Sequence, residues 1–176
     1  MKRGFTSNMV WYDTAQICLG GHVTNSSTQV HPESNKKYCH RCGKQTITEC
    51  PKCKKPIQGH PYLENNARSL IPIKAPRFCK ECGNIFPWFE DQVQAAKELA
   101  EMQEDLDDKD KELLKKSFDD LIQYNAKSEV AALKIRRVFE KLKLGQDHQL
   151  YKAAINLATG VSGGILVKIL TSPTGS

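Results

Sequence analysis

Hydrophobic residues are spaced differently in the two parts of the chain. Up to about residue 88 they occur in short runs broken by turn residues, and seven of the eight prolines lie there. Beyond it they recur every three or four positions, the spacing of one helix face, and the next proline is Pro173. The sequence therefore predicts an α+β protein, in which short strands and turns precede an all-α region of three to four helices.

Capping residues divide the helical region. The first helix is expected near Pro87, which a first turn tolerates, and an acidic run at 104–108 separates it from the second. Ser128 is expected to cap the third helix and Gly145 to end it. The fourth is expected to start at about Asp147, with five apolar residues in register: Leu150, Ala154, Leu157, Val161 and Ile165.

The first part reads as short β segments joined by polar loops. The β segments are expected at 10–12 and 15–17, directly before Cys18. Residues 58–77 contain a glycine and three prolines, so they are expected to form a loop with a short strand at 70–73.

Seven cysteines, all between Cys18 and Cys82, carry the clearest chemical signal in the chain. Six of them form three Cys-x-x-Cys pairs, a spacing typical of zinc sites and not of a disulfide framework. No apolar run follows the charged start of the chain, so we expect no signal peptide and a cytoplasmic location, where thiolates bind metal. A redox Cys-x-x-Cys would need a thioredoxin-like βαβ context, which the sequence lacks.

The cysteines divide into two expected zinc sites, because a structural zinc takes four tetrahedral ligands, most often four cysteines or three cysteines and a histidine. The last two pairs are expected to form an all-cysteine site: Cys50, Cys53, Cys79 and Cys82. The first pair is expected to join the unpaired cysteine and a histidine four residues beyond it: Cys18, His22, Cys39 and Cys42. Gly20 and Gly21 let the chain fold back between them. Two Zn²⁺ ions per chain are expected.

Other groupings stay open at this point. His31, His40 and His60 compete with His22 as the fourth ligand. His40 lies inside a Cys-x-x-Cys loop and should point away from the metal, whereas the other two lie in polar loops and are expected to be solvated. The first pair could also join the second pair, leaving Cys18 and His22 for the third, but sequential pairing crosses fewer connections. Eight ligands leave neither ion an open position, so we expect structural zinc and no enzyme activity.

Three motifs carry a resemblance to a known family: WYDTAQICLGGHVTN, YCHRCGKQTITECPKCKKPIQG and PRFCKECGNIFPWF. In this order, and followed by a helical region, they resemble a bacterial family of uncharacterised double zinc-ribbon proteins. The resemblance covers about residues 10–89 closely and the helices to about residue 144 more loosely. It implies the same eight zinc ligands and no assigned activity. The expected domains are a double zinc ribbon at 1–87, a helical domain at 88–170 and a flexible tail at 171–176.

The excess of positive over negative charge lies in the first part of the chain. Residues 1–90 contain 13 Lys or Arg and six Asp or Glu, and the remainder contains 13 and 14. A basic surface binds nucleic acid by releasing counterions from phosphates. However, seven thiolates and two Zn²⁺ together subtract about three charges, so part of the excess is expected to compensate the zinc centres. Of the aromatic candidates for base stacking, Tyr38, Tyr62 and Phe78, the first and last directly precede cysteines and are expected to pack on the ribbons.

Three further segments each have more than one interpretation. Residues 86–89, Phe-Pro-Trp-Phe, are expected to form a hydrophobic plug, with an exposed recognition patch as the alternative. Residues 153–167 are an uncharged apolar run too short to span a bilayer; they are expected to pack within the helices, with self-association through Gly160 and Gly164 or membrane contact as alternatives. The third helix has a basic face, either solvated or suited to an acidic partner: Lys134, Arg136, Arg137, Lys141 and Lys143.

These observations favour a non-enzymatic protein-interaction module, an adaptor or scaffold. Two zinc ribbons would form its rigid platform, and the helices would dock a protein partner or form a homo-oligomer. The first alternative is a nucleic-acid-binding zinc-ribbon protein. The second is a membrane-associated protein acting through its last helix.

Overall fold

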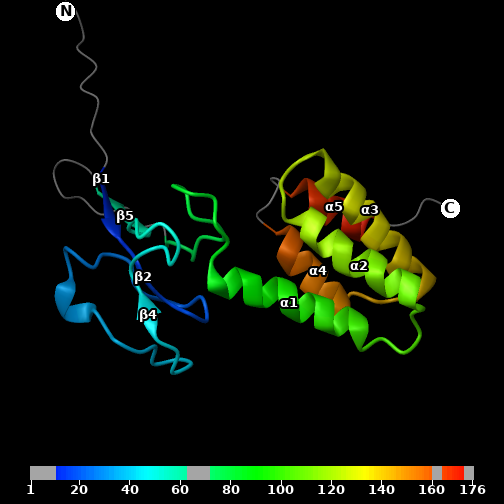
Figure 1. Ribbon diagram of the computed structural model, residues 1–176, viewed down its shortest axis with the longest axis horizontal. Coiled ribbons are helices and arrows are strands. Elements are labelled where there is room, and N and C mark those ends of the chain that lie inside the picture. Colours follow the sequence, from blue (N-terminus) through cyan, green and yellow to red (C-terminus); the bar gives the residue numbers. More distant parts are fainter. Residues whose placement is uncertain (1–10, 63–71, 160–163, 173–176) are drawn as a thin grey trace, which may run out of the picture. The chain divides into compact units, whose positions relative to one another are not determined.

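A computed structural model describes residues 11–62, 72–159 and 164–172. Within these ranges it contains five strands, one 3-10 turn and five α-helices (Figure 1). The chain divides into two compact units, residues 1–90 and 91–176. The predicted α+β class, with strands first and helices after them, is therefore confirmed. The predicted domain boundaries at residues 87 and 170 stay predictions, and residues 173–176 of the predicted tail lie outside the described part of the chain.

Two small antiparallel sheets form the first unit, which we call the cysteine-rich unit. One sheet pairs β1 (Trp11–Thr14) with β5 (Gln58–Tyr62). In the other, β2 (Gln16–Cys18) lies between β3 (Val23–Asn25) and β4 (Thr46–Ile47). Both sheets join segments that are far apart in the sequence, so their strands depend on tertiary contacts.

The prediction of a loop from residue 58 onward is wrong for β5. Gly59 permits the strand, because a Cβ atom at this position would lie 2.4 Å from the carbonyl oxygen of Ser26 and 2.7 Å from the carbonyl carbon of Thr14. The close approach of two other segments therefore requires glycine where the sequence alone indicates a turn. Of the strand predicted at 70–73, the first two residues lie outside the described ranges, and Pro72 and Ile73 are not in a strand.

Buried polar side chains hold the long loop between β3 and β4. The carboxylate of Asp13, only 2% exposed, accepts hydrogen bonds from the backbone N–H groups of Gln29 and Val30, both at 3.0 Å. The side-chain amide of Asn25 donates to the carbonyl oxygen of His31 at 2.8 Å. The loop, which includes the 3-10 turn Pro32–Ser34, is thus fixed by hydrogen bonds where apolar contacts are few.

The second unit is helical. Its elements begin with α1, which starts in the cysteine-rich unit, and continue in chain order: α1 (Pro87–Glu101), α2 (Asp108–Leu121), α3 (Ala126–Lys141), α4 (Gln149–Ala158) and α5 (Ile165–Thr171). Pro87 occupies the first position of α1, as predicted. Asp107 caps α2 by accepting a hydrogen bond from the backbone N–H of Asp110 at 2.8 Å, so the acidic run is the predicted break.

The predicted ends of α3 need correction. Asn125, and not Ser128, is its N-cap: the Asn125 side chain accepts from the backbone N–H of Lys127 at 2.8 Å, and the Ser128 hydroxyl accepts from the Asn125 backbone N–H at 3.1 Å. Ser128 therefore completes a capping box from inside the helix. At the other end, Lys143 turns the chain with a φ of +53°, so α3 ends before Gly145.

The predicted fourth helix is two helices. α4 ends at Ala158, and α5 starts after Gly164, whose φ of +90° is left-handed and cannot continue a helix. A Cβ atom on Gly164 would meet nothing within 4 Å, so this glycine provides backbone freedom and no close helix contact. Gly160 lies outside the described residues. No described helix combines the length and the hydropathy that crossing a membrane requires.

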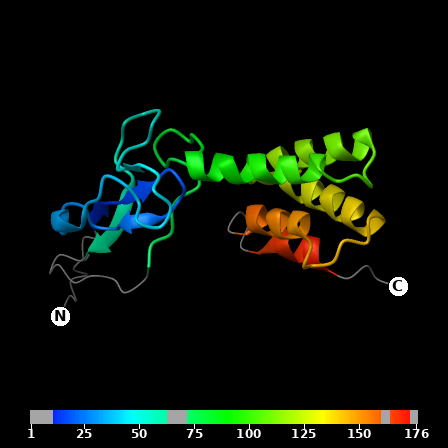
Figure 2. The same ribbon diagram turned by 90° about the horizontal axis from the view of Figure 1, so that it is seen from below.

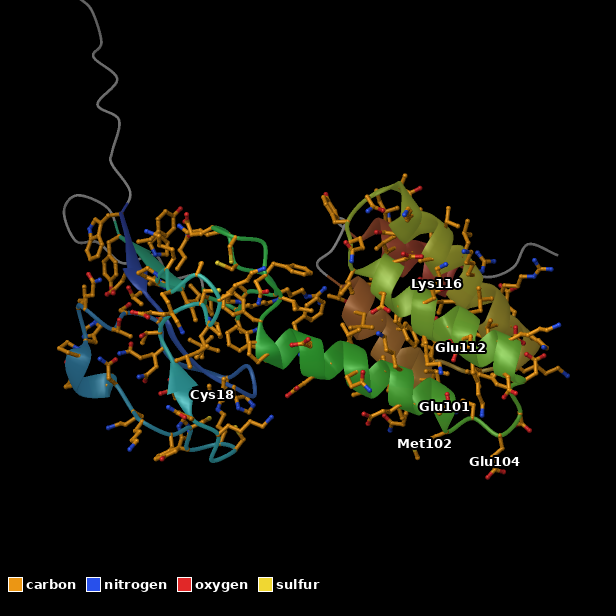
Figure 3. All side chains as sticks on the ribbon, in the orientation of Figure 1. Cys18, Glu101, Met102, Glu104, Glu112 and Lys116 are labelled. Atoms are coloured by element: carbon orange, nitrogen blue, oxygen red, sulfur yellow. The ribbon has the colours of Figure 1, made fainter. Side chains whose placement is uncertain are left out.

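The core of the helical unit contains no cysteine. α2 packs on α3, and α5 contacts both α3 and α4 (Figure 2). Seven large side chains from α2 to α5 are at most 1% exposed: Leu114, Phe118, Leu121, Ile135, Leu150, Leu157 and Leu166. Ion pairs join α1 to α2: Lys97 with Asp119 at 2.7 Å and Lys115 with Glu101 at 3.0 Å, the latter carboxylate at the end of α1 (Figure 3). The unit therefore has its own apolar core.

Replacement of Gly59 tests how closely β5 approaches the backbone of Ser26 and Thr14. We expect Gly59→Ala to lower the stability of the cysteine-rich unit by about 3 kcal/mol, because the added methyl group would overlap backbone atoms of Ser26 and Thr14, and no flexible side chain can move aside to make room. Thermal unfolding followed by tryptophan fluorescence gives the melting temperature of this unit, since Trp11 and Trp88 both belong to it. Gly145→Ala is the control, with open space around its Cβ position. Equal melting temperatures for the two variants would contradict this packing.

Candidate metal centres

The three Cys-x-x-Cys pairs lie on hairpins with the same hydrogen bonds. We name them hairpin 1 (38–45), hairpin 2 (49–56) and hairpin 3 (78–85), each bounded by one isolated β-bridge. In each, the backbone N–H of the first cysteine donates to the carbonyl oxygen five residues later, at 2.8 to 2.9 Å. The carbonyl of that cysteine accepts from the N–H four residues later, at 2.8 to 3.0 Å. These two bonds leave both sulfurs on one side of the turn.

The turn closes through a residue with left-handed backbone. This residue is Gly43 in hairpin 1 and Gly83 in hairpin 3, with φ of +70° and +68°. Hairpin 2 places Lys54 there with φ +61°, a conformation that costs a residue with a Cβ about 1–2 kcal/mol. The shared position explains the glycine after two of the pairs, and it shows that hairpin 2 adopts the same turn with strain.

Cys18 lies on a fourth turn, one residue shorter. Its backbone N–H donates to the carbonyl oxygen of His22 at 3.0 Å, and Gly21 closes the turn with φ +84°. The backbone N–H of His22 also donates to the Cys18 sulfur at 3.3 Å. A Cβ atom on Gly20 would lie 3.3 Å from the Cys42 sulfur. The two glycines thus bring Cys18, at the end of β2 (Figure 3), and His22 to one point.

The first group of ligand atoms joins this short turn to hairpin 1. The Nδ1 atom of His22 lies 3.6 Å from the sulfurs of Cys18 and Cys39, and the Cys18 sulfur lies 3.6 Å from that of Cys42. All four ligand atoms are within 4.8 Å of one another. These are the four residues of the first predicted site.

The second group joins hairpin 2 to hairpin 3. The sulfurs of Cys50 and Cys82 are 3.8 Å apart, and those of Cys53 and Cys79 are 3.6 Å apart. All four sulfurs lie within 4.8 Å of one another. The structure therefore has the sequential pairing, and the alternative pairing of hairpin 1 with hairpin 2 is not formed.

These distances match a tetrahedral metal centre. Metal–sulfur bonds of about 2.3 Å give sulfur–sulfur edges of about 3.8 Å, and replacing one sulfur by nitrogen shortens its edges to about 3.6 Å. A disulfide would need about 2.05 Å, and all seven cysteines are free. Each group is thus compatible with one metal ion held by four protein ligands.

Backbone N–H groups favour ionisation of the first cysteine in two hairpins. Burial opposes ionisation of Cys39, yet hydrogen bonds from the backbone N–H groups of Arg41 and Cys42 lower its pKa to about 6. Those of Cys53 and Lys52 lower the pKa of Cys50 to about 7. Thiolates are the form that binds metal, so the backbone of these two turns favours the metal-binding form of Cys39 and Cys50.

Burial and the closeness of the other sulfurs raise the pKa of other cysteines in the two groups. The backbone N–H of Lys55 favours the Cys53 thiolate, but burial and hydrogen bonds with the three neighbouring sulfurs raise the pKa of Cys53 to about 12. Burial likewise raises the pKa of Cys18. Four sulfurs at this spacing cannot all ionise unless a cation lies between them, and a divalent metal ion supplies that charge.

The other histidines lie outside both groups. His40 is exposed within hairpin 1, and the His31 ring lies 3.3 Å from the Glu33 carboxylate. The prediction that His60 is solvated is wrong: it is 2% exposed on β5, with its ring edge-on to Tyr62. The backbone N–H of His60 donates to the carbonyl oxygen of Ser26 at 2.8 Å, so a segment distant in the sequence lies beside this residue, which its local sequence does not indicate.

The Phe-Pro-Trp-Phe segment is buried, which favours the plug interpretation over an exposed patch. Phe86, Trp88 and Phe89 are at most 4% exposed. The Trp88 ring stacks on Phe86 at 4.6 Å, and its Nε1 donates to the carbonyl oxygen of Pro76 at 2.7 Å. A Cβ atom on Gly21 would lie 3.0 Å from the Trp88 Cβ. The plug thus packs directly against the turn that carries Cys18 and His22.

The two aromatic residues before the cysteines differ. Phe78 is 38% exposed but packs edge-on against Phe89, with ring centroids 5.5 Å apart. Tyr38 is 56% exposed, so the prediction that it packs on the ribbon is wrong. The β-bridge places its backbone opposite Gln45 at the start of hairpin 1.

Two groups of thiol and imidazole ligands at tetrahedral spacing on hairpin turns, followed by helices, place the chain in the class of proteins with two cysteine-rich candidate metal centres. Within that class, the chain belongs to the family described as "Uncharacterized protein conserved in bacteria (DUF2321)", whose model matches residues 11–163. The resemblance drawn from the motifs is therefore confirmed. No curated protein and no solved structure matches the chain.

The shared left-handed position predicts opposite effects at two hairpins. Gly83→Ala should lower the free energy of unfolding of the cysteine-rich unit by about 1–2 kcal/mol, because the methyl group has open space and only the backbone conformation is strained. Lys54→Gly should raise it by up to about 1 kcal/mol by relieving the same strain. Denaturant unfolding followed by tryptophan fluorescence measures both. A loss of stability in Lys54→Gly would show that the strain is absent.

Proposed function

We propose that the protein is a non-enzymatic zinc protein whose two Zn²⁺ ions have a structural role. The observation that supports this most directly is the closure of both groups: each has four protein ligand atoms at tetrahedral spacing. A catalytic zinc keeps a position open for water or substrate, and four protein ligands fill every position. Zinc in these centres would join turns that are distant in sequence.

Zinc suits the two ligand sets better than other metals do. Four thiolates accept zinc or an iron–sulfur cluster, whereas three thiolates and one imidazole at tetrahedral spacing are a common structural zinc set. His22 faces the sulfurs through Nδ1, and a neutral histidine can bind a metal ion through either ring nitrogen. We therefore assign the same metal to both groups.

We further propose that the helical unit docks a protein partner, which makes the protein an adaptor or scaffold. Support comes from α3, where Val130 and Leu133 are 50% and 53% exposed and lie three residues apart on one helix face. Contiguous exposed apolar patches mark protein-interaction sites, and in this proposal the pair forms part of one. The basic face expected on this helix is less suited to an acidic partner, because Arg136 pairs with Glu140 and Lys141 pairs with Asp107.

Metal analysis tests the zinc proposal. Protein purified without chelator should contain two equivalents of zinc per chain, and Cys50→Ser should contain about one, because a tetrahedral site that loses a thiolate binds zinc far more weakly. His40→Ala should keep both, since His40 lies outside the groups. Chelation should remove the zinc and leave most of the far-UV helical signal, because the helical core contains no cysteine. One equivalent in the wild type, or iron as the main metal, would overturn the proposal.

Substitution on α3 tests the docking proposal. Proteins captured from the source cell by the zinc-loaded wild type should be lost with the double variant Val130→Lys and Leu133→Lys, because charged groups would then face the partner's apolar surface. Met102→Lys is the control for an added lysine on an exposed apolar residue, since Met102 is 73% exposed directly after α1 (Figure 3) and lies away from α3 in the sequence. Mass spectrometry of the eluates identifies the proteins that each variant captures. Retention of every captured protein by the double variant would contradict docking through α3.

A further inference from the structure

The three hairpins share one backbone but carry different side chains. The residue before the first cysteine is exposed Tyr38 in hairpin 1, Glu49 in hairpin 2 and Phe78, packed on Phe89, in hairpin 3. In hairpin 3, Lys80 lies 3.7 Å from the carboxylate of Glu81. Hairpin 1 alone combines an exposed aromatic ring with cations and no carboxylate. The turn geometry does not require this combination, because the other hairpins form without it.

The surface around hairpin 1 is basic over an unbroken stretch. No Asp or Glu occurs from residue 34 to residue 48. Four exposed cations lie in this stretch: Lys36, Lys37, Arg41 and Lys44. The first zinc centre would contribute a charge of about −1, from three thiolates and one Zn²⁺. The surface is therefore net positive after the metal charge is included.

The Tyr38 ring lies within this basic stretch. It is 56% exposed, and the Nζ atom of Lys37 lies 5.6 Å from the ring centroid. A flat ring beside several cations matches the chemistry of a nucleotide: a base stacks on the ring, and the phosphates on either side contact the cations. A base can stack in this way only when it is unstacked from its neighbours, as in a single strand.

We propose that hairpin 1 and the preceding lysines, residues 36–45, bind single-stranded nucleic acid. Tyr38 stacks on a base, and Lys36, Lys37 and Lys44 contact successive phosphates. The proposal rests on the proposed structural zinc, because the first centre holds the hairpin on which these side chains lie. It concerns a different surface from the partner-docking face of α3.

Hairpin 2 supplies a control with the same change in charge. Lys52, Lys54 and Lys55 are exposed and lie on the same turn geometry, but Glu49 stands where hairpin 1 has Tyr38. A triple Lys→Gln substitution, either at Lys36, Lys37 and Lys44 or at Lys52, Lys54 and Lys55, removes three positive charges from the whole protein. General attraction between a basic protein and a polyanion would respond equally to both. If the strand binds at hairpin 1, only the triple substitution at Lys36, Lys37 and Lys44 would weaken binding.

Fluorescence anisotropy with a labelled single strand of about twelve nucleotides tests the proposal. We expect the zinc-loaded wild type to bind it more tightly than duplex DNA of the same length. Tyr38→Leu should weaken binding about tenfold or more, and Tyr38→Phe should restore it, because stacking needs the ring and not the hydroxyl. The triple variant Lys36→Gln, Lys37→Gln and Lys44→Gln should also weaken binding, and the slope of log affinity against log salt should fall by about 2. The hairpin 2 triple variant should bind within about twofold of the wild type.

Three results would overturn the proposal: equal loss in the two triple variants, unchanged binding by Tyr38→Leu, or equal binding of heparin, which is a polyanion without bases. Zinc content is measured on every sample. Two equivalents of zinc together with no strand binding would reject this site and leave the structural zinc standing. Absence of zinc from the wild type would reject the proposed function itself.

Discussion

One backbone turn underlies the cysteine-rich unit: a loop closed by two hydrogen bonds that leaves two ligand atoms on the same side. It occurs three times at one length and once, at Cys18, one residue shorter. Each turn needs a residue with positive φ to close, and glycine supplies it at all but Lys54. Since a turn presents two ligand atoms and a tetrahedral centre needs four, every turn has to meet a second one. This requirement brings together residues as far apart as Cys50 and Cys82.

Around these turns the unit combines a small apolar core with buried polar contacts. Ala15, Ile17 and Ile57 are nearly inaccessible to solvent, and the plug formed by Phe86 and Trp88 adds the large side chains that short strands cannot provide. Asp13 fixes the long loop by accepting backbone N–H groups. A unit with so little apolar burial depends on additional constraints, and metal centres would supply them, because the free energy of metal binding is then available to folding.

The helical unit depends on apolar packing instead. Leu114, Phe118 and Leu121 of α2 are completely buried, and the unit contains none of the seven cysteines. The two units therefore suit different tasks. Hairpins that keep their shape can present exposed side chains such as Tyr38 at fixed positions, whereas a helix such as α3 can expose aliphatic residues to a partner while its other face stays in the core.

The sequence by itself determined the parts of this protein that follow from local rules. Ligand spacing indicated the turns, and apolar periodicity indicated α1 to α3, because each depends on residues within a few positions of one another. The tertiary structure decided the rest. It made β5 a strand through the close passage of Gly59 beside Ser26, buried His60 on that strand, and left Tyr38 in solvent. Each of these outcomes depends on which distant segment lies beside the residue, and no local spacing of residues encodes that.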